Sequence, residues 1–107
     1  MKESARLHHA AMEEVDLALD ARRKKDAEST LKHFRAAFEL EKQAATLDPA
    51  LPEPSRSVLL RSAAALGIEC GEWKEAASLI TTGLAGDPPA AIKKELEALR
   101  RSITARG

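Results

Sequence analysis

The fold is decided by residues 59–89, LLRSAAALGIECGEWKEAASLITTGLAGDPP. Two apolar runs with helical spacing stand on either side of Gly71, and glycine is common just past the end of a helix. Pro88 and Pro89 close the stretch, since proline cannot continue a helix. The pattern predicts two helices, at about 55–70 and 73–85, joined by a tight turn.

This stretch resembles a tetratricopeptide repeat, a unit of ~34 residues in which two antiparallel helices cross at small side chains. The repeat has small residues at the crossings, a glycine at the turn, an aromatic residue after it and a final proline. Gly67 departs from the pattern, which favours an aromatic residue there. The resemblance implies a right-handed stack of helical hairpins. The matching positions are Ala64, Gly71, Trp73, Ala76, Ile80, Gly83, Leu84 and Pro88.

The chain also resembles a group of short bacterial proteins of the same helical type. The similarity lies in residues 38–47, 54–73 and 83–96. That group has no assigned activity, so the resemblance implies a fold and leaves the function open.

The N-terminal half is predicted to form a second hairpin, with helices at 4–24 and 27–47. No proline or glycine separates them, so the break depends on Asp26, a residue type favoured at helix N-caps. One helix over 4–47 is the alternative, but a single rod could bury little of its own apolar stripe. The inward face of the second helix is expected to carry Leu31, Phe34, Phe38 and Ala45.

The remaining segments are a linker and a final helix. Residues 48–54, DPALPEP, hold three prolines and end the preceding helix. A one-sided apolar stripe over 89–104 suits a helix that caps a stack. We therefore predict one all-α domain over residues 1–107, made of hairpin 4–47, linker 48–54, hairpin 55–86 and capping helix 89–104.

Composition excludes several classes of partner. Equal numbers of acidic and basic residues, 17 each, remove the basic excess that nucleic-acid binding requires, and aromatic residues for base stacking are few. No apolar run approaches the ~20 residues of a membrane span, and the N-terminus is too charged for a signal peptide. Because Cys70 is the single cysteine, a reducing compartment is expected, and we predict a cytoplasmic protein.

Metal, cofactor and catalytic sites are not expected. His8, His9, His33 and Cys70 are the conventional soft-metal ligands, but they lack the close spacing of zinc sites. Cys70 ends a predicted helix, where the dipole disfavours a thiolate, so it is interpreted as a packing residue. The basic run at 22–25, RRKK, is interpreted as a solvated helix end. No acid–base or nucleophile arrangement can be named, so the chain is not expected to be an enzyme.

Glu41 is the sharpest local signal, because the helical spacing puts this carboxylate on or beside an apolar face. A buried carboxylate needs a partner. Arg56 and Arg61 on the next helix are the candidates. The trio is expected to form either a structural ion pair or a polar pocket where the two hairpins meet.

Two functions follow as hypotheses. The first is a protein-interaction module that binds a peptide or partner helix in a groove lined by the first helix of each hairpin, with homodimerisation as a variant. Its binding face is expected to include Arg56, Leu60 and Glu69. The alternative is a small-ligand or regulatory domain that uses the polar pocket near Glu41, Arg56 and Arg61.

Overall fold

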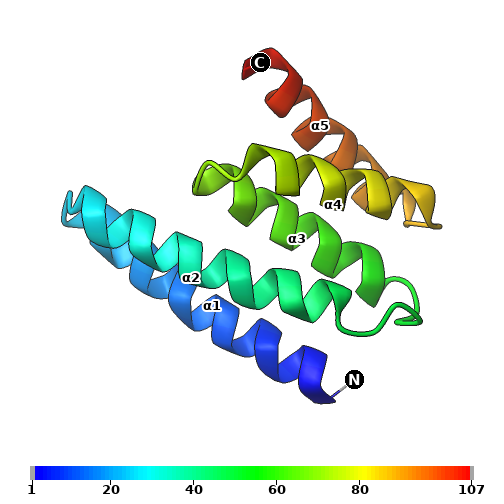
Figure 1. Ribbon diagram of the computed structural model, residues 1–107, viewed down its shortest axis with the longest axis horizontal. Helices are drawn as coiled ribbons and strands as arrows, with labels where there is room; N and C mark the ends of the chain where they lie inside the picture. The colour runs from blue at the N-terminus through cyan, green and yellow to red at the C-terminus, as the bar shows by residue number, and fades with distance from the viewer. Residues whose placement is uncertain (1, 107) are drawn as a thin grey trace.

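The computed structural model describes residues 2–106, and this part of the chain is entirely helical in its regular structure (Figure 1). The all-α prediction is confirmed. The described residues form five helices: α1 (Lys2–Arg23), α2 (Ala27–Thr46), α3 (Ser55–Glu69), α4 (Trp73–Ala85) and α5 (Ala90–Arg106).

The turn between α1 and α2 lies where Asp26 suggested a break, so residues 4–47 are a hairpin. Lys25 adopts a left-handed conformation with φ of 59°, which stops the helix. The Asp26 carboxylate then accepts a hydrogen bond from the Ser29 N–H at 3.1 Å and caps α2. This hydrogen bond is the first cause of a lowered Asp26 pKa.

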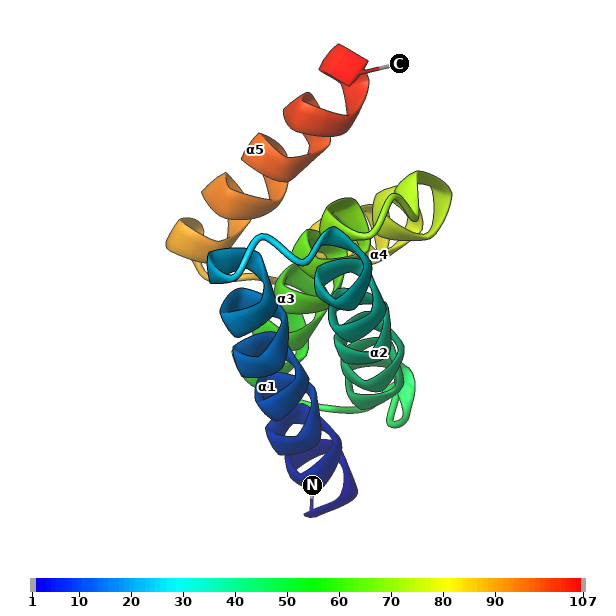
Figure 2. The same cartoon turned by 90° about the vertical axis from the view of Figure 1, so that its left-hand side faces the viewer.

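The helices form a flat array that measures 39 × 36 × 21 Å. α2 packs between α1 and α3, α4 packs on the far side of α3, and α5 packs against both α3 and α4 (Figures 1 and 2). As a result α1 and α3, the first helices of the two hairpins, run in the same direction.

The core is built where small residues let helices approach closely. Phe38 of α2 is completely buried, and a Cβ added at Gly67 of α3 would lie 3.0 Å from its Cε1 atom. Gly83 of α4 plays the same part under α5, because a Cβ there would lie 3.0 Å from Cδ1 of Leu96. Leu96 is fully buried, whereas the rest of the α5 stripe, Ile92, Leu99 and Ile103, is only partly covered.

The first hairpin is longer than the second, and this difference exposes a residue that was expected inside. α1 and α2 contain 22 and 20 residues, each seven more than α3 and α4 with 15 and 13. Seven residues of α-helix are about 10 Å long, and Figure 1 shows the α1–α2 end of the first hairpin as an overhang beyond the α3–α4 turn. Leu31 lies on this overhang and is 42% exposed, so its predicted inward position is wrong.

Candidate functional site

A polar pair with a buried carboxylate joins α1 to α2. The side chain of Glu41 is completely buried, and His8 Nδ1 lies 2.8 Å from its Oε2 and 3.0 Å from its Oε1. About one turn away on each helix, Ser4 Oγ donates to the backbone oxygen of Ala44 at 3.2 Å. The buried carboxylate thus receives its partner from α1, and the two contacts fix how α1 sits on α2.

The predicted meeting of Glu41 with Arg56 or Arg61 is wrong. Arg61 pairs with Glu95 of α5. Arg56 donates to the backbone oxygen of Thr82, at the C-terminal end of α4, at 3.3 Å. α2 turns the face that carries Glu41 toward α1 as well as α3, and the partner is on α1. The polar pocket expected from these three side chains is therefore not formed.

The other two residues predicted for a binding face, Leu60 and Glu69, lie in different surroundings. Leu60 is 1% exposed and belongs to the core, and it lies at the base of a hollow of about 170 Å³ that Arg56 and Thr82 also line. Glu69 is exposed, as expected, and accepts a hydrogen bond from Arg22 of α1 at 2.9 Å. Arg22 and Glu69 join the C-terminal ends of the parallel helices α1 and α3.

The N-terminal halves of α1 and α3 are separated by a groove of about 210 Å³. Its walls are mostly apolar, and His8 stands on the α1 side with a half-exposed imidazole. Because Nδ1 is bonded to Glu41, the other ring nitrogen is the one left for a ligand. We call this hollow the α1–α3 groove; it is lined by Ser4, Ala5, His8, Leu51, Ser55, Val58 and Leu59.

The linker closes one end of the groove. The Asp48 side chain accepts from the Ala50 N–H at 2.9 Å, and its backbone oxygen accepts from the Leu51 N–H at 3.1 Å. This turn directs Leu51 inward, where it is 3% exposed. At the start of α3, Oε1 of Glu53 accepts from the Ser57 N–H at 2.9 Å. Burial is the largest influence on the Glu53 pKa and raises it, yet the hydrogen bonds from Ser57 and Asp87 and the charge of Arg56 together outweigh it, and the pKa is lowered.

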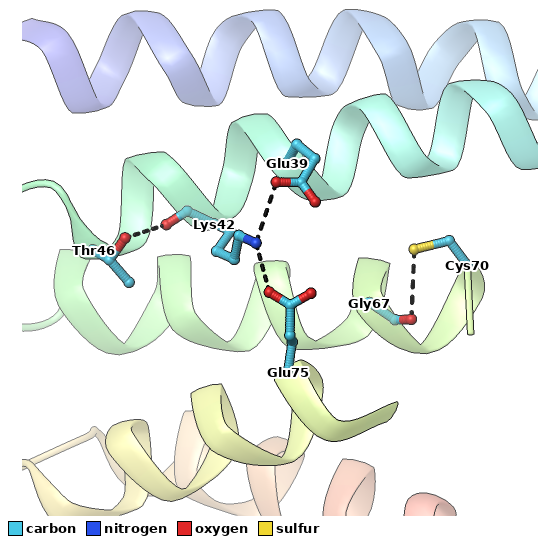
Figure 3. A network of polar contacts seen from close by, with 6 residues as sticks. All are labelled: Glu39, Lys42, Thr46, Gly67, Cys70 and Glu75. Carbon is cyan, nitrogen blue, oxygen red and sulfur yellow. Dashed lines mark hydrogen bonds and ion pairs between the residues drawn. The ribbon is translucent and has the colours of Figure 1, made fainter. Parts of the chain in front are cut away.

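A second polar network connects α2 to α4 (Figure 3). Lys42 Nζ lies 2.6 Å from Oε1 of Glu75 and 3.2 Å from Oε1 of Glu39, and it stands 5.1 Å from the centre of the Phe38 ring. The hydrogen bond with Glu75 is the main cause of a raised Lys42 pKa, and the same bond lowers the pKa of Glu75. The ammonium group pairs with both carboxylates, so this network links α2 to α4.

Cys70 is a buried thiol at the end of α3. Its Sγ donates to the backbone oxygen of Gly67 at 3.6 Å (Figure 3), and burial raises the pKa of the thiol. A protonated, covered thiol is a poor nucleophile. Its surroundings fit the packing role predicted from the sequence.

The histidines and the basic run have separate roles. His33 Nδ1 lies 2.7 Å from Glu14 Oε1, and the side chain of His9 is 81% exposed. Within residues 2–106 no three potential metal ligands come together. The residues of the RRKK run make different contacts. Arg22 lies over the Phe34 ring at 4.9 Å from its centre, whereas Arg23 and Lys24 pair with Asp20.

Comparison of the chain with protein-family models, with curated proteins and with solved structures gives no match. None of the described helices has the length and apolar character needed to cross a membrane.

Proposed function

We propose that this protein is an interaction module that binds a peptide segment or a partner helix in the α1–α3 groove. The observation that carries the proposal is the groove itself. Two parallel helices, each the first of its hairpin, leave an apolar hollow between them while α2 packs behind. Parallel helices of this kind form the binding face of stacked helical hairpins.

A tetratricopeptide-like, right-handed stack is part of this proposal. Supporting it, the small residues of the repeat pattern occupy helix crossings. Ala64 and Ala76 are completely buried, and Gly83 is packed beneath Leu96. Gly71 has a φ of 80°, which suits its place in the turn between α3 and α4.

The size of the groove favours a side chain of a peptide over a free small molecule. Pockets for drug-sized ligands span roughly 300–1,000 Å³. The groove, at about 210 Å³, is smaller and offers an apolar floor with Leu51 and Val58. The hydroxyl group of Ser55 and the imidazole of His8 stand at its walls and can bond to a peptide backbone.

The setting of this interaction is also proposed. A single buried thiol suits the reducing cytoplasm, and a zero net charge with few aromatic residues argues for a protein partner over nucleic acid.

The test is selection of peptides from a displayed random library against the purified protein. We expect enrichment of sequences that share a short apolar motif, because the groove accepts apolar side chains. Binding of a synthetic enriched peptide is then measured by fluorescence anisotropy. A selection that enriches no common motif contradicts the proposal.

A blocked variant separates the groove from other surfaces. Ala5→Arg combined with Val58→Arg places two long charged side chains in the groove, and we expect at least a tenfold loss of affinity for the enriched peptide. Ala91→Arg combined with Ala98→Arg makes the same change on the exposed side of α5 and should leave binding unchanged. Equal affinities of both double variants would place the peptide elsewhere.

A further inference from the structure

A second hollow, of about 330 Å³, lies at the overhang of the first hairpin and is separate from the α1–α3 groove. It is lined by Arg22, Lys25, Ala27, Thr30, Leu31 and Glu69. Ala27, Leu31 and Arg35 follow one another at four-residue spacing along α2, and all three are exposed. They form the flank of α2 that α3 would cover if the second hairpin were as long as the first.

This flank is basic around an apolar centre. Arg22, Lys25 and Arg35 contribute three positive charges, and the one acidic residue in the hollow, Glu69, is bonded to Arg22. Leu31 is 42% exposed in the middle. We call the surface formed by Arg22, Lys25, Ala27, Leu31 and Arg35 the basic shelf.

The opposite flank of the same hairpin has the complementary character. Glu13, Asp16, Leu17 and Asp20 share one face of α1, at spacings of three and four residues. Asp20 already pairs with Arg23 and Lys24 of its own chain, so Glu13 and Asp16 supply the negative charge of this face. Leu17 is 48% exposed at its centre. This face points away from α2, because the buried residue Ala18 lies on the other side of the helix. We call it the acidic face.

We propose that the basic shelf binds the acidic face of a second copy of this chain. Leu17 of one copy enters the hollow beside Leu31 of the next, and the carboxylates of Glu13 and Asp16 meet Lys25 and Arg35. The eight residues 13–20 span about 12 Å of helix, which matches the overhang of about 10 Å. A chain of zero net charge adds no overall repulsion between copies.

The contact is heterologous, because two different surfaces meet: the acidic face of one copy and the basic shelf of the next. Repetition of such a contact gives open chains or rings. The surface is small, so the association is weak and grows with concentration. The contact leaves the α1–α3 groove free. Peptide binding in the groove and association through the basic shelf can therefore be tested separately, and either can fail without the other.

Sedimentation velocity of the full chain tests the proposal over a concentration series at low and high salt. We expect the weight-average sedimentation coefficient to rise with concentration at low salt, and the rise to shrink in high salt because charge pairs are screened. A concentration-independent monomer at low salt overturns the proposal.

Charge reversal identifies the surfaces. Lys25→Glu with Arg35→Glu removes the shelf, and Glu13→Lys with Asp16→Lys removes the acidic face; each double variant should remain monomeric. Lys93→Glu with Lys94→Glu on α5 is the matched control and should associate like the unmodified chain. Circular dichroism confirms that all variants are folded.

Mixing gives the decisive result. The acidic face of the shelf variant can meet the intact shelf of the acidic-face variant, and the two charge-reversed surfaces are also of opposite sign, so an equimolar mixture should associate again although each variant alone does not. A mixture that stays monomeric, or single variants that still associate, would show that these two surfaces do not bind each other. Association of the chain only with an added acidic peptide would make the shelf a site for another protein.

Discussion

At the scale of single residues, the buried Glu41 carboxylate depends on His8 for its compensation. Removal of one partner from a buried pair costs about 3–5 kcal/mol, and His8 is half-exposed, so we expect His8→Ala to lower the free energy of unfolding by about 2–3 kcal/mol. Urea unfolding followed by circular dichroism measures the change. The neighbouring variant His9→Ala alters an exposed side chain and should stay within about 0.5 kcal/mol.

A double-mutant cycle separates this pair from simple loss of packing. His8→Ala and Glu41→Gln should each destabilise, and together they should cost less than the sum of the two. Additive effects would mean that the two side chains do not stabilise each other.

Lys42 and Glu75 give the fold a pH dependence. The lowered pKa of Glu75 adds stability above its ordinary value of 4.5, and this stability is lost as the pH falls through the depressed value. The raised pKa of Lys42 adds stability below its ordinary value of 10.5, and this is lost as the pH rises through the raised value. The pair therefore stabilises the fold between these two limits.

We expect Lys42→Met to be less stable than the unmodified protein near neutral pH, by an amount that shrinks in strong acid as Glu75 is protonated. Both side chains are partly exposed, so the effect is modest and should decrease with salt. Thermal unfolding across the pH series measures it. Lys74→Met, on the exposed side of α4, is the control. A difference that persists unchanged below about pH 3 would mean that lost packing on Phe38, and not charge, is responsible.

At the scale of helices, Gly67 sets how closely α2, α3 and α4 approach. A Cβ at this position would lie 3.0 Å from Phe38 Cε1 and 3.2 Å from the Cβ of Ala76, and both neighbours are completely buried. Gly67→Val should therefore destabilise the protein by about 1–3 kcal/mol despite the better helix propensity of valine.

Ala65→Val makes a comparable addition two residues earlier, on a partly exposed face of α3, and should cost about 0.5 kcal/mol. Urea unfolding of both variants gives the comparison. Equal stabilities would mean that the crossing at Gly67 can open without cost.

The helices themselves could be predicted because their signals are local. Asp26, Gly71 and the prolines of the linker act on the backbone within a few residues, and the helix boundaries follow from them. The exposure of Leu31 could not be predicted from periodicity. An apolar stripe shows which side of a helix is buried, but it does not show over what length the neighbouring hairpin covers that side.

The candidate site was less accessible to prediction. Periodicity correctly indicated that Glu41 is buried, but three helices compete to supply its partner. In the sequence, His8 is a conventional metal ligand where no metal site is expected and has no other predicted role, although its position four residues after Ser4 places both polar side chains on one face of α1. That spacing is the signal that could have identified a polar seam between α1 and α2.

At the scale of the whole molecule, unequal hairpin lengths and a flat array leave two separate surfaces. The α1–α3 groove lies toward the linker end, and the basic shelf lies at the α1–α2 turn, at the other end of the first hairpin (Figure 1). An array of this shape can bind a peptide at one end while it contacts a second copy at the other. The two activities should therefore be independent of each other in variants.

The most direct measurement of the central claim is an NMR titration of the ¹⁵N-labelled protein with the selected peptide. We expect amide shift changes concentrated at Ala5, His8, Leu51 and Val58, on both walls of the α1–α3 groove. Changes confined to the α2–α4 surface around Lys42 and Glu75, or no changes at saturating peptide, would contradict it.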